Sequence, residues 1–72
     1  MDITIRYSSE LNVALVEGET EEGVDFIDAW IPEGEYIVLD SGRMTFQYDA
    51  LPAFTQAAKE RNFTMEQEET FQ

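Results

Sequence analysis

Carboxylates are the side chains of this sequence with the greatest capacity for chemistry, and several of them recur at every second residue. The chain of 72 residues holds 16 Asp and Glu against four Lys and Arg, so its formal net charge is −12. A soluble domain of this size is comfortable with a net charge of magnitude about 2–8. Because excess like charge destabilises the compact state, we expect the surplus to act on a positively charged partner.

Acidic residues at alternate positions would lie on one face of an extended strand, about 6.6 Å apart. Glu66 and Glu68 have this spacing, and so do Glu17, Glu19 and Glu21 if that segment is extended. Duplex DNA carries one phosphate per about 3.4 Å of axis on each strand. Such rows therefore predict a surface that attracts a basic nucleic-acid-binding groove rapidly and in a salt-dependent way.

The predicted partner-binding residues combine these rows with acidic residues from the middle of the chain and one tryptophan. They are Glu17, Glu19, Glu21, Glu22, Asp25, Asp28, Trp30, Glu33, Glu35, Glu66, Glu68 and Glu69, with Asp40 adding to the acidic supply. Any one acid alone reads as a solvated surface residue, and their sum carries the prediction. Trp30 is either a core residue or an exposed interface anchor beside Asp28.

The segment 17–28 has an acid spacing that is found in one class of metal site. Its acids fall at relative positions 1, 3, 5, 9 and 12, which are ligand offsets of a calcium loop. Glu22 stands at the sixth position, where the sharp turn needs glycine. The flanking residues do not read as two helices. We therefore favour a solvated acidic loop over a calcium site, and we predict no metal.

The residue types needed for catalysis are scarce. The chain has no His for proton transfer near neutral pH and no Cys nucleophile. The three serines, Ser8, Ser9 and Ser41, have no evident base partner. With 16 carboxylates some pair always lies at a workable distance, so a glycosidase-like pair carries no information. We predict a protein that is not an enzyme and uses no cofactor.

Charge and hydropathy also restrict partners and location. A strongly negative chain is a poor ligand for nucleic acid or anionic lipid, both of which attract Lys and Arg. No apolar stretch approaches the roughly 20 residues of a membrane span, and the N-terminus shows no signal-peptide pattern. The absence of Cys suits a reducing compartment. We expect a protein of the cytoplasm of a bacterial host, without direct contact to nucleic acid or membrane.

The first part of the chain is expected to form strands that position these acids. Residues 1–7 alternate apolar and polar side chains, which predicts a half-buried strand. Residues 11–16 are apolar on both faces and predict an interior strand. Residues 17–23 read as an acidic loop. Residues 24–31 fit helical or strand spacing, and their aromatic, β-rich composition favours a strand.

The middle of the chain predicts a hairpin. Residues 32–35 form a turn with Pro early and Gly late. Residues 36–39 are apolar on both faces and predict a central strand. Asp40-Ser41-Gly42 is a tight connection to a second strand, where Met44, Phe46 and Tyr48 alternate with polar residues.

One helix is clear in the sequence, over residues 50–61. Asp49 is its expected N-cap, Pro52 fits the first turn, and a buried stripe is expected. The stripe consists of Leu51, Phe54 and Ala58. Asn62 is expected to end the helix in the left-handed conformation. Residues 63–71 alternate again and predict a last strand at an edge of the sheet, with carboxylates facing water.

These elements predict one folded domain over residues 1–72. We expect an α+β fold with a mostly antiparallel sheet of four to six strands and one helix, at about 50–61, packed on one face. Disorder is a poor alternative because 43% of the residues are hydrophobic and fall in periodic runs.

A small, strongly acidic, cysteine-free α+β chain resembles the phage-encoded inhibitors that imitate DNA, among them anti-CRISPR, anti-restriction and uracil-glycosylase inhibitor proteins. The resemblance is one of size and charge rather than of motif. It implies a non-enzymatic inhibitor that binds a basic nucleic-acid-binding protein or ribonucleoprotein complex. Such an inhibitor would occupy the surface meant for DNA or RNA, as a monomer or small homo-oligomer.

A second resemblance is local and covers about a third of the chain. Residues 31–38, Ser41-Gly42 and residues 51–54 are similar to gyrase-inhibitor-like effector-binding domains, which usually contain two such halves. One half fits here. This similarity implies a small-molecule-binding module with a pocket lined by Trp30, Tyr36 or Tyr48. A third alternative is a structural or assembly protein of a phage or mobile element, which predicts a stable homo-oligomer.

Overall fold

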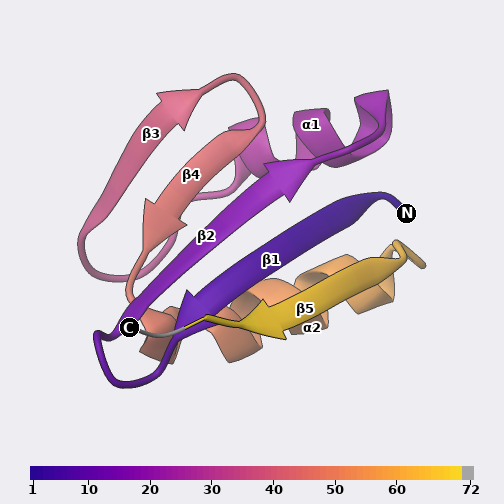
Figure 1. Cartoon of the computed structure of the whole chain (residues 1–72). Coiled ribbons are helices and arrows are strands. Elements are labelled where there is room, and N and C mark those ends of the chain that lie inside the picture. The colour runs from indigo at the N-terminus through magenta and orange to yellow at the C-terminus, as the bar shows by residue number, and fades with distance from the viewer. Residues whose placement is uncertain (71–72) are drawn as a thin grey trace.

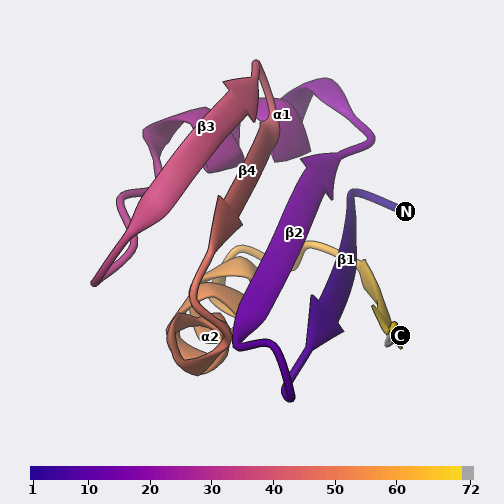
Figure 2. The same cartoon turned by 60° about the vertical axis from the view of Figure 1, so that its left-hand side comes forward.

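The computed structural model describes residues 1–70 and has an α+β fold, in which two α-helices cover one face of a five-stranded sheet (Figure 1). The elements are β1 (Ile3–Ser8), β2 (Val13–Gly18), α1 (Glu21–Ala29), β3 (Tyr36–Asp40), β4 (Arg43–Phe46), a 3₁₀ turn (Tyr48–Ala50), α2 (Leu51–Glu60) and β5 (Met65–Glu69). The strand order is β3-β4-β2-β1-β5, with β3 and β5 at the two edges (Figure 2). β1 and β5 are parallel and every other neighbouring pair is antiparallel. The predicted fold class is confirmed, with one helix more than expected.

Apolar and polar side chains alternate along β1, and the apolar ones point to the face of the sheet that the helices cover. Ile3 and Ile5 of β1 are buried, and so are Ala14 and Val16 of β2. β2 lies between β1 and β4, so the interior strand predicted over 11–16 is present, although it begins at Val13. Burial of these apolar side chains beneath the helices supplies the main favourable contribution to folding.

The preference for a strand over residues 24–31 was wrong, because α1 occupies this part of the chain. Thr20 is its N-cap, and the Thr20 side chain accepts a hydrogen bond from the backbone N–H of Gly23 at 3.1 Å. Glu21 and Glu22 lie in the first turn, where acidic side chains favour the helix dipole. The predicted acidic loop over 17–23 is therefore divided between the end of β2 and the start of α1. Local capping outweighed the β-rich composition.

The hairpin between β3 and β4 is present, but β3 is an edge strand and not the central strand that was predicted. Gly42 supplies the positive φ of the turn, at 74°. The carboxylate of Asp28 in α1 accepts hydrogen bonds from the backbone N–H of Gly42 at 2.6 Å and from the hydroxyl of Ser41 at 2.8 Å. This contact fixes the hairpin turn against α1. The second strand of the hairpin ends at Phe46, so Tyr48 lies beyond it.

Helix α2 packs through the predicted stripe, since Leu51, Phe54 and Ala58 are all buried. Its predicted N-cap was wrong. Asp49 lies inside the 3₁₀ turn that leads into the helix, and Ala50 takes the cap position without a side-chain hydrogen bond. Asn62 follows the helix with φ of 62°, so the predicted left-handed ending is confirmed.

The last strand lies at an edge of the sheet, as predicted, but covers only Met65–Glu69 of the expected range. Phe71 of that range lies outside the described residues. Asp2, directly before β1, joins the start of β5 to the start of α1. Its carboxylate accepts hydrogen bonds from the backbone N–H of Thr64 at 3.0 Å and from the hydroxyl of Thr20 at 3.0 Å.

These hydrogen bonds predict a pH-dependent role for Asp2. The backbone N–H of Thr64, and after it the Thr20 hydroxyl, lower the pKa of the Asp2 carboxyl below its ordinary value of 3.8. A lowered folded-state pKa contributes stability above the unfolded value, and this stability is lost as pH falls through the folded pKa. Asp2→Asn should therefore lower the urea midpoint at neutral pH, and the difference from wild type should narrow below pH 3.8.

Glu10→Gln is the matched control for this measurement, because exposed Glu10 accepts no hydrogen bond among residues 1–70. Its urea midpoint should follow that of the wild type across the same pH range. A difference between Asp2→Asn and wild type that stays constant, or widens, on acidification would contradict the assigned role of the carboxylate.

Candidate partner-binding surface

The face of the sheet opposite the helices carries a row of residues that crosses all five strands where β2 ends. The strand registers place Asp40 beside Arg43, Arg43 beside Glu17, Glu17 beside Thr4, and Thr4 beside Glu66. Neighbouring strands are about 4.8 Å apart. The row contains three acids, Asp40, Glu17 and Glu66. Each acid is separated from the next one in the row by two strand spacings, about 9.6 Å.

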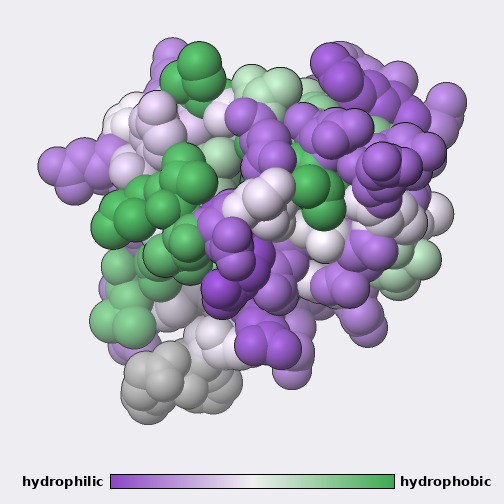
Figure 3. Space-filling view, turned by 90° about the horizontal axis from the view of Figure 1, so that it is seen from above, coloured by the Kyte–Doolittle hydropathy of each residue, from purple (hydrophilic) through white to green (hydrophobic). Residues whose placement is uncertain are grey.

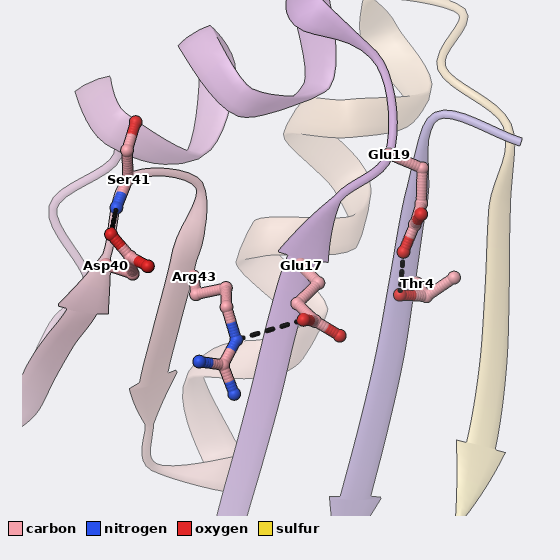
Figure 4. A network of polar contacts seen from close by, with 6 residues as sticks. All are labelled: Thr4, Glu17, Glu19, Asp40, Ser41 and Arg43. Atoms are coloured by element: carbon pink, nitrogen blue, oxygen red, sulfur yellow. Dashed lines mark hydrogen bonds and ion pairs between the residues drawn. The ribbon is translucent and has the colours of Figure 1, made fainter.

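Two side-chain contacts hold this row in place (Figure 4). Glu17 Oε2 lies 2.9 Å from Arg43 Nε, in the single ion pair found among residues 1–70. Glu19, in the loop after β2, reaches back over the sheet, and its Oε2 accepts a hydrogen bond from Thr4 Oγ1 at 3.0 Å. Almost every carboxylate of the described chain therefore lacks a cationic partner within the chain.

We call Glu17, Glu19, Glu66 and Glu68 the acidic corner. Glu66 and Glu68 are exposed and share one face of β5, with Arg6 of β1 beside Glu68. Exposed Glu21 follows in the first turn of α1. Hydrophilic side chains cover much of this end of the molecule, while hydrophobic side chains gather on the side of β3 (Figure 3). The corner places several negative charges on rigid elements, next to few positive ones.

The remaining predicted acids lie elsewhere. Asp28 is occupied with the β3–β4 turn, as described above. Glu22 and Asp25 line a groove on the helical side with Phe26 and Arg61, and the guanidinium carbon of Arg61 lies 5.1 Å from the centre of the Phe26 ring.

Three further acids lie along the two edge strands. Glu33 and Glu35 precede β3, and Glu69 in β5 accepts a hydrogen bond from Ser9 at 2.9 Å. The structure thus brings together a part of the predicted set and distributes the rest around the molecule.

Trp30 takes the core position that the sequence left open. It caps the C-terminus of α1, is half-buried, and lies 5.8 Å from the Phe26 ring and 5.7 Å from the Phe54 ring, between centroids. Its Nε1 is buried and has no hydrogen-bond partner within residues 1–70. The indole is therefore packed against the core and does not stand out as an interface anchor.

The aromatic residues considered for a small-molecule pocket do not share one. Tyr36 lines a shallow groove with Val13 and Thr45. Tyr48 stacks on Tyr7, with 5.3 Å between ring centroids, and lines a separate groove beside α2. Trp30 packs against the core as described above.

No group of three or more acidic side chains within residues 1–70 is close enough to hold a metal ion. The twelve residues considered as a calcium loop are divided between β2 and α1, so a loop of that length does not form. In the same part of the chain, neither helix combines the length and the apolar character needed to cross a lipid bilayer.

One surface feature was missed from the sequence, namely that β3 is apolar and exposed. A strand that is apolar on both faces predicts burial on both faces, and this is why residues 36–39 were placed at the centre of the sheet. The available signal was the acidic residues that bracket the strand, Glu33 and Glu35 before it and Asp40 at its end. Charged side chains are one of the features by which edge strands are protected.

Comparison with models of known protein families, with curated proteins and with solved structures finds no match for this chain. No family is therefore assigned. The functional proposal rests on the charge and shape of the described surface.

Proposed function

We propose that this protein is a non-enzymatic acidic inhibitor that binds a basic nucleic-acid-handling protein and blocks the surface meant for DNA or RNA. The observation that carries the proposal is the acidic corner. Its four carboxylates meet one ion-pair partner, Arg43, in a chain of net charge −12. Negative charge left unpaired at this density is a cost to the folded state, and a cationic partner relieves it.

The spacing of the corner supports recognition by a groove built for a phosphate backbone. Glu66 and Glu68 are two residues apart on one strand, about 6.6 Å, and Glu17 lies two strands away from Glu66, about 9.6 Å. A basic groove arranged along a nucleic acid meets charges at intervals of several ångströms. The corner offers charges at comparable intervals.

Acids that are already fixed in the folded protein favour binding, because less conformational entropy is lost when the partner binds. Glu17, Glu66 and Glu68 lie on strands, and Glu19 is held by its hydrogen bond from Thr4. The Glu17 and Glu19 side chains, which Arg43 and Thr4 hold in place, therefore lose less conformational entropy on association. Long-range attraction between a chain of charge −12 and a basic groove also raises the association rate, and salt weakens this effect.

The test uses a triple variant of the corner, Glu19→Gln, Glu66→Gln and Glu68→Gln, which changes the net charge from −12 to −9. Immobilised wild-type protein is incubated with a bacterial lysate at low salt, and bound proteins are eluted by a rising salt gradient and identified. We expect basic nucleic-acid-binding proteins, and we expect an excess of duplex DNA or RNA to displace them. The triple variant should release them at clearly lower salt.

A matched control separates local from overall charge. The variant Glu10→Gln, Asp49→Asn and Glu60→Gln also has a net charge of −9 but leaves the corner intact. Its elution should stay close to that of the wild type. Equal weakening in both variants, capture that is insensitive to salt, or failure of nucleic acid to compete would each overturn the proposal.

A further inference from the structure

β3 is a second, chemically different surface at one edge of the sheet. All five of its residues are exposed, and four of them are apolar: Tyr36 at 43%, Ile37 at 63%, Val38 at 60% and Leu39 at 47% exposure. β3 pairs with β4 on one side only. The backbone N–H and C=O groups of its outer side are therefore available to another strand.

The exposure of β3 has a structural cause. Val38 and Tyr36 pair with Met44 and Phe46 of β4, and paired residues share one face of the sheet. Met44 and Phe46 are only 2% and 3% exposed, whereas their partners on β3 are open to solvent. The helical layer thus ends beneath β4, and β3 extends beyond it with both faces and one edge uncovered.

The two edges of the sheet are built differently. β5, at the other edge, has the sequence Met-Glu-Gln-Glu-Glu, and these charges discourage pairing with another strand. β3 carries its only charge at its last residue, Asp40, where the register shifts between Val38 and Asp40. That irregularity ends regular pairing at one end of the strand, and Tyr36, Ile37 and Val38 remain a regularly paired, exposed segment without a charged side chain.

The charges around β3 indicate which strand fits there. Glu33 and Glu35 precede the segment and Asp40 ends it. If a second copy paired antiparallel about Val38, Asp40 would lie opposite Tyr36 of that copy, and Glu35 of that copy, the residue before this Tyr36, would lie opposite Ser41 beside Asp40. Each copy would also bring a net charge of −12. Electrostatics therefore disfavours self-pairing and favours a strand with basic residues at its ends.

We propose that β3 receives an extended segment of the basic partner by strand addition. The segment has alternating apolar side chains over three or so residues and Lys or Arg at both ends. Backbone hydrogen bonds and contacts with Ile37 and Val38 hold its centre, and the flanking acids hold its ends. The sign of the partner's charge rests on the proposed function, whereas the strand addition rests on β3 alone.

The probe is a labelled nine-residue peptide with an alternating Val and Thr centre and two lysines at each end, measured by fluorescence anisotropy against the whole protein. A peptide with glutamates in place of the lysines is its control. At low salt, we expect the lysine peptide to bind at least tenfold more tightly than the glutamate peptide. Binding should slow hydrogen exchange at backbone amides of residues 36–39 and not at those of β5.

Three variants locate the peptide. Ile37→Thr with Val38→Thr keeps strand propensity and net charge, and should weaken binding about tenfold at low and high salt alike. Glu33→Gln with Glu35→Gln and Asp40→Asn should weaken it several-fold at low salt only. The corner variant Glu19→Gln, Glu66→Gln and Glu68→Gln has the same net charge as the flank variant and should bind the peptide like the wild type.

Several outcomes would overturn the proposal. These are no measurable binding of the lysine peptide, equal binding of the glutamate peptide, equal loss in the corner variant, or a dimer in analytical ultracentrifugation that the Ile37→Thr, Val38→Thr exchange abolishes. The last result would assign the edge to a second copy.

If the peptide binds as expected but nucleic acid does not compete in the lysate experiment, the proposed function fails and the strand addition stands. If nucleic acid competes in the lysate experiment but the Ile37→Thr, Val38→Thr variant binds the peptide like the wild type, the strand addition fails and the proposed function stands.

Discussion

Phe54→Ala is expected to leave most of the protein unfolded at room temperature. Phe54 is fully buried in α2, and its ring centroid lies 5.3, 5.7 and 5.5 Å from those of Phe26, Trp30 and Phe46. Phe54 therefore packs against a ring of α1 and a ring of β4 at the same time. Truncation removes its transfer free energy and leaves a cavity, at a cost of about 3–5 kcal/mol.

The size of the domain makes this loss decisive. Domains are stable by about 5–15 kcal/mol, and small ones lie at the low end because they bury less surface. Repulsion among the negative charges, at a net charge of −12, reduces the free energy of unfolding further. Near-ultraviolet circular dichroism and urea unfolding measure the effect, with Phe54→Leu as a milder control at about 1 kcal/mol. A Phe54→Ala protein that unfolds within about 1 kcal/mol of the wild type would contradict the assigned core.

Gly23→Ala should destabilise the protein by about 2 kcal/mol, although alanine is the better helix former. Gly23 is buried in the first turn of α1, and a Cβ atom there would overlap the carbonyl oxygen of Asp2. That carbonyl is fixed by a hydrogen bond from the backbone N–H of Glu19 at 2.7 Å. Relieving the overlap breaks or lengthens this bond, and the loss exceeds the roughly 1 kcal/mol that helix propensity returns.

The reverse exchange at an exposed helical position gives the comparison. Ala53→Gly, in α2, should lower stability by about 1 kcal/mol through propensity alone. Both exchanges between glycine and alanine should therefore destabilise, for different reasons. Urea unfolding monitored by tryptophan fluorescence measures both. A Gly23→Ala protein that is more stable than the wild type would show that α1 does not approach the carbonyl of Asp2 as closely as described.

Features with local causes were predictable from the sequence. The stripe of α2 depends on helical spacing, the hairpin depends on Gly42, and the left-handed Asn62 depends on its own conformational preference, and all three are present. The edge position of β5 followed from its charges. In each of these cases a few neighbouring residues determine the outcome, so the pattern is readable without knowledge of the tertiary structure.

The errors share a different cause. In α1, a Thr20 cap and two acidic residues in the first turn outweighed a β-rich composition, and the balance between them depends on packing of Phe26 and Ile27 beneath the sheet. For β3, apolar residues on both faces gave no information on whether anything covers them. The acidic corner combines β2 with β5, which are brought together only by the strand order. Its composition was predictable, and its placement was not.

The parallel pairing of β1 with β5 has a consequence for how the molecule is made. Asp2 and Thr64, which are joined by hydrogen bonds, stand 62 positions apart in the chain, and such distant contacts slow folding. During synthesis on the ribosome, β1 cannot pair with β5 until residues 65–69 have left the exit tunnel. The nascent sheet is therefore open along β1 until the residues of β5 emerge, and β1 can pair with β2 before it pairs with β5.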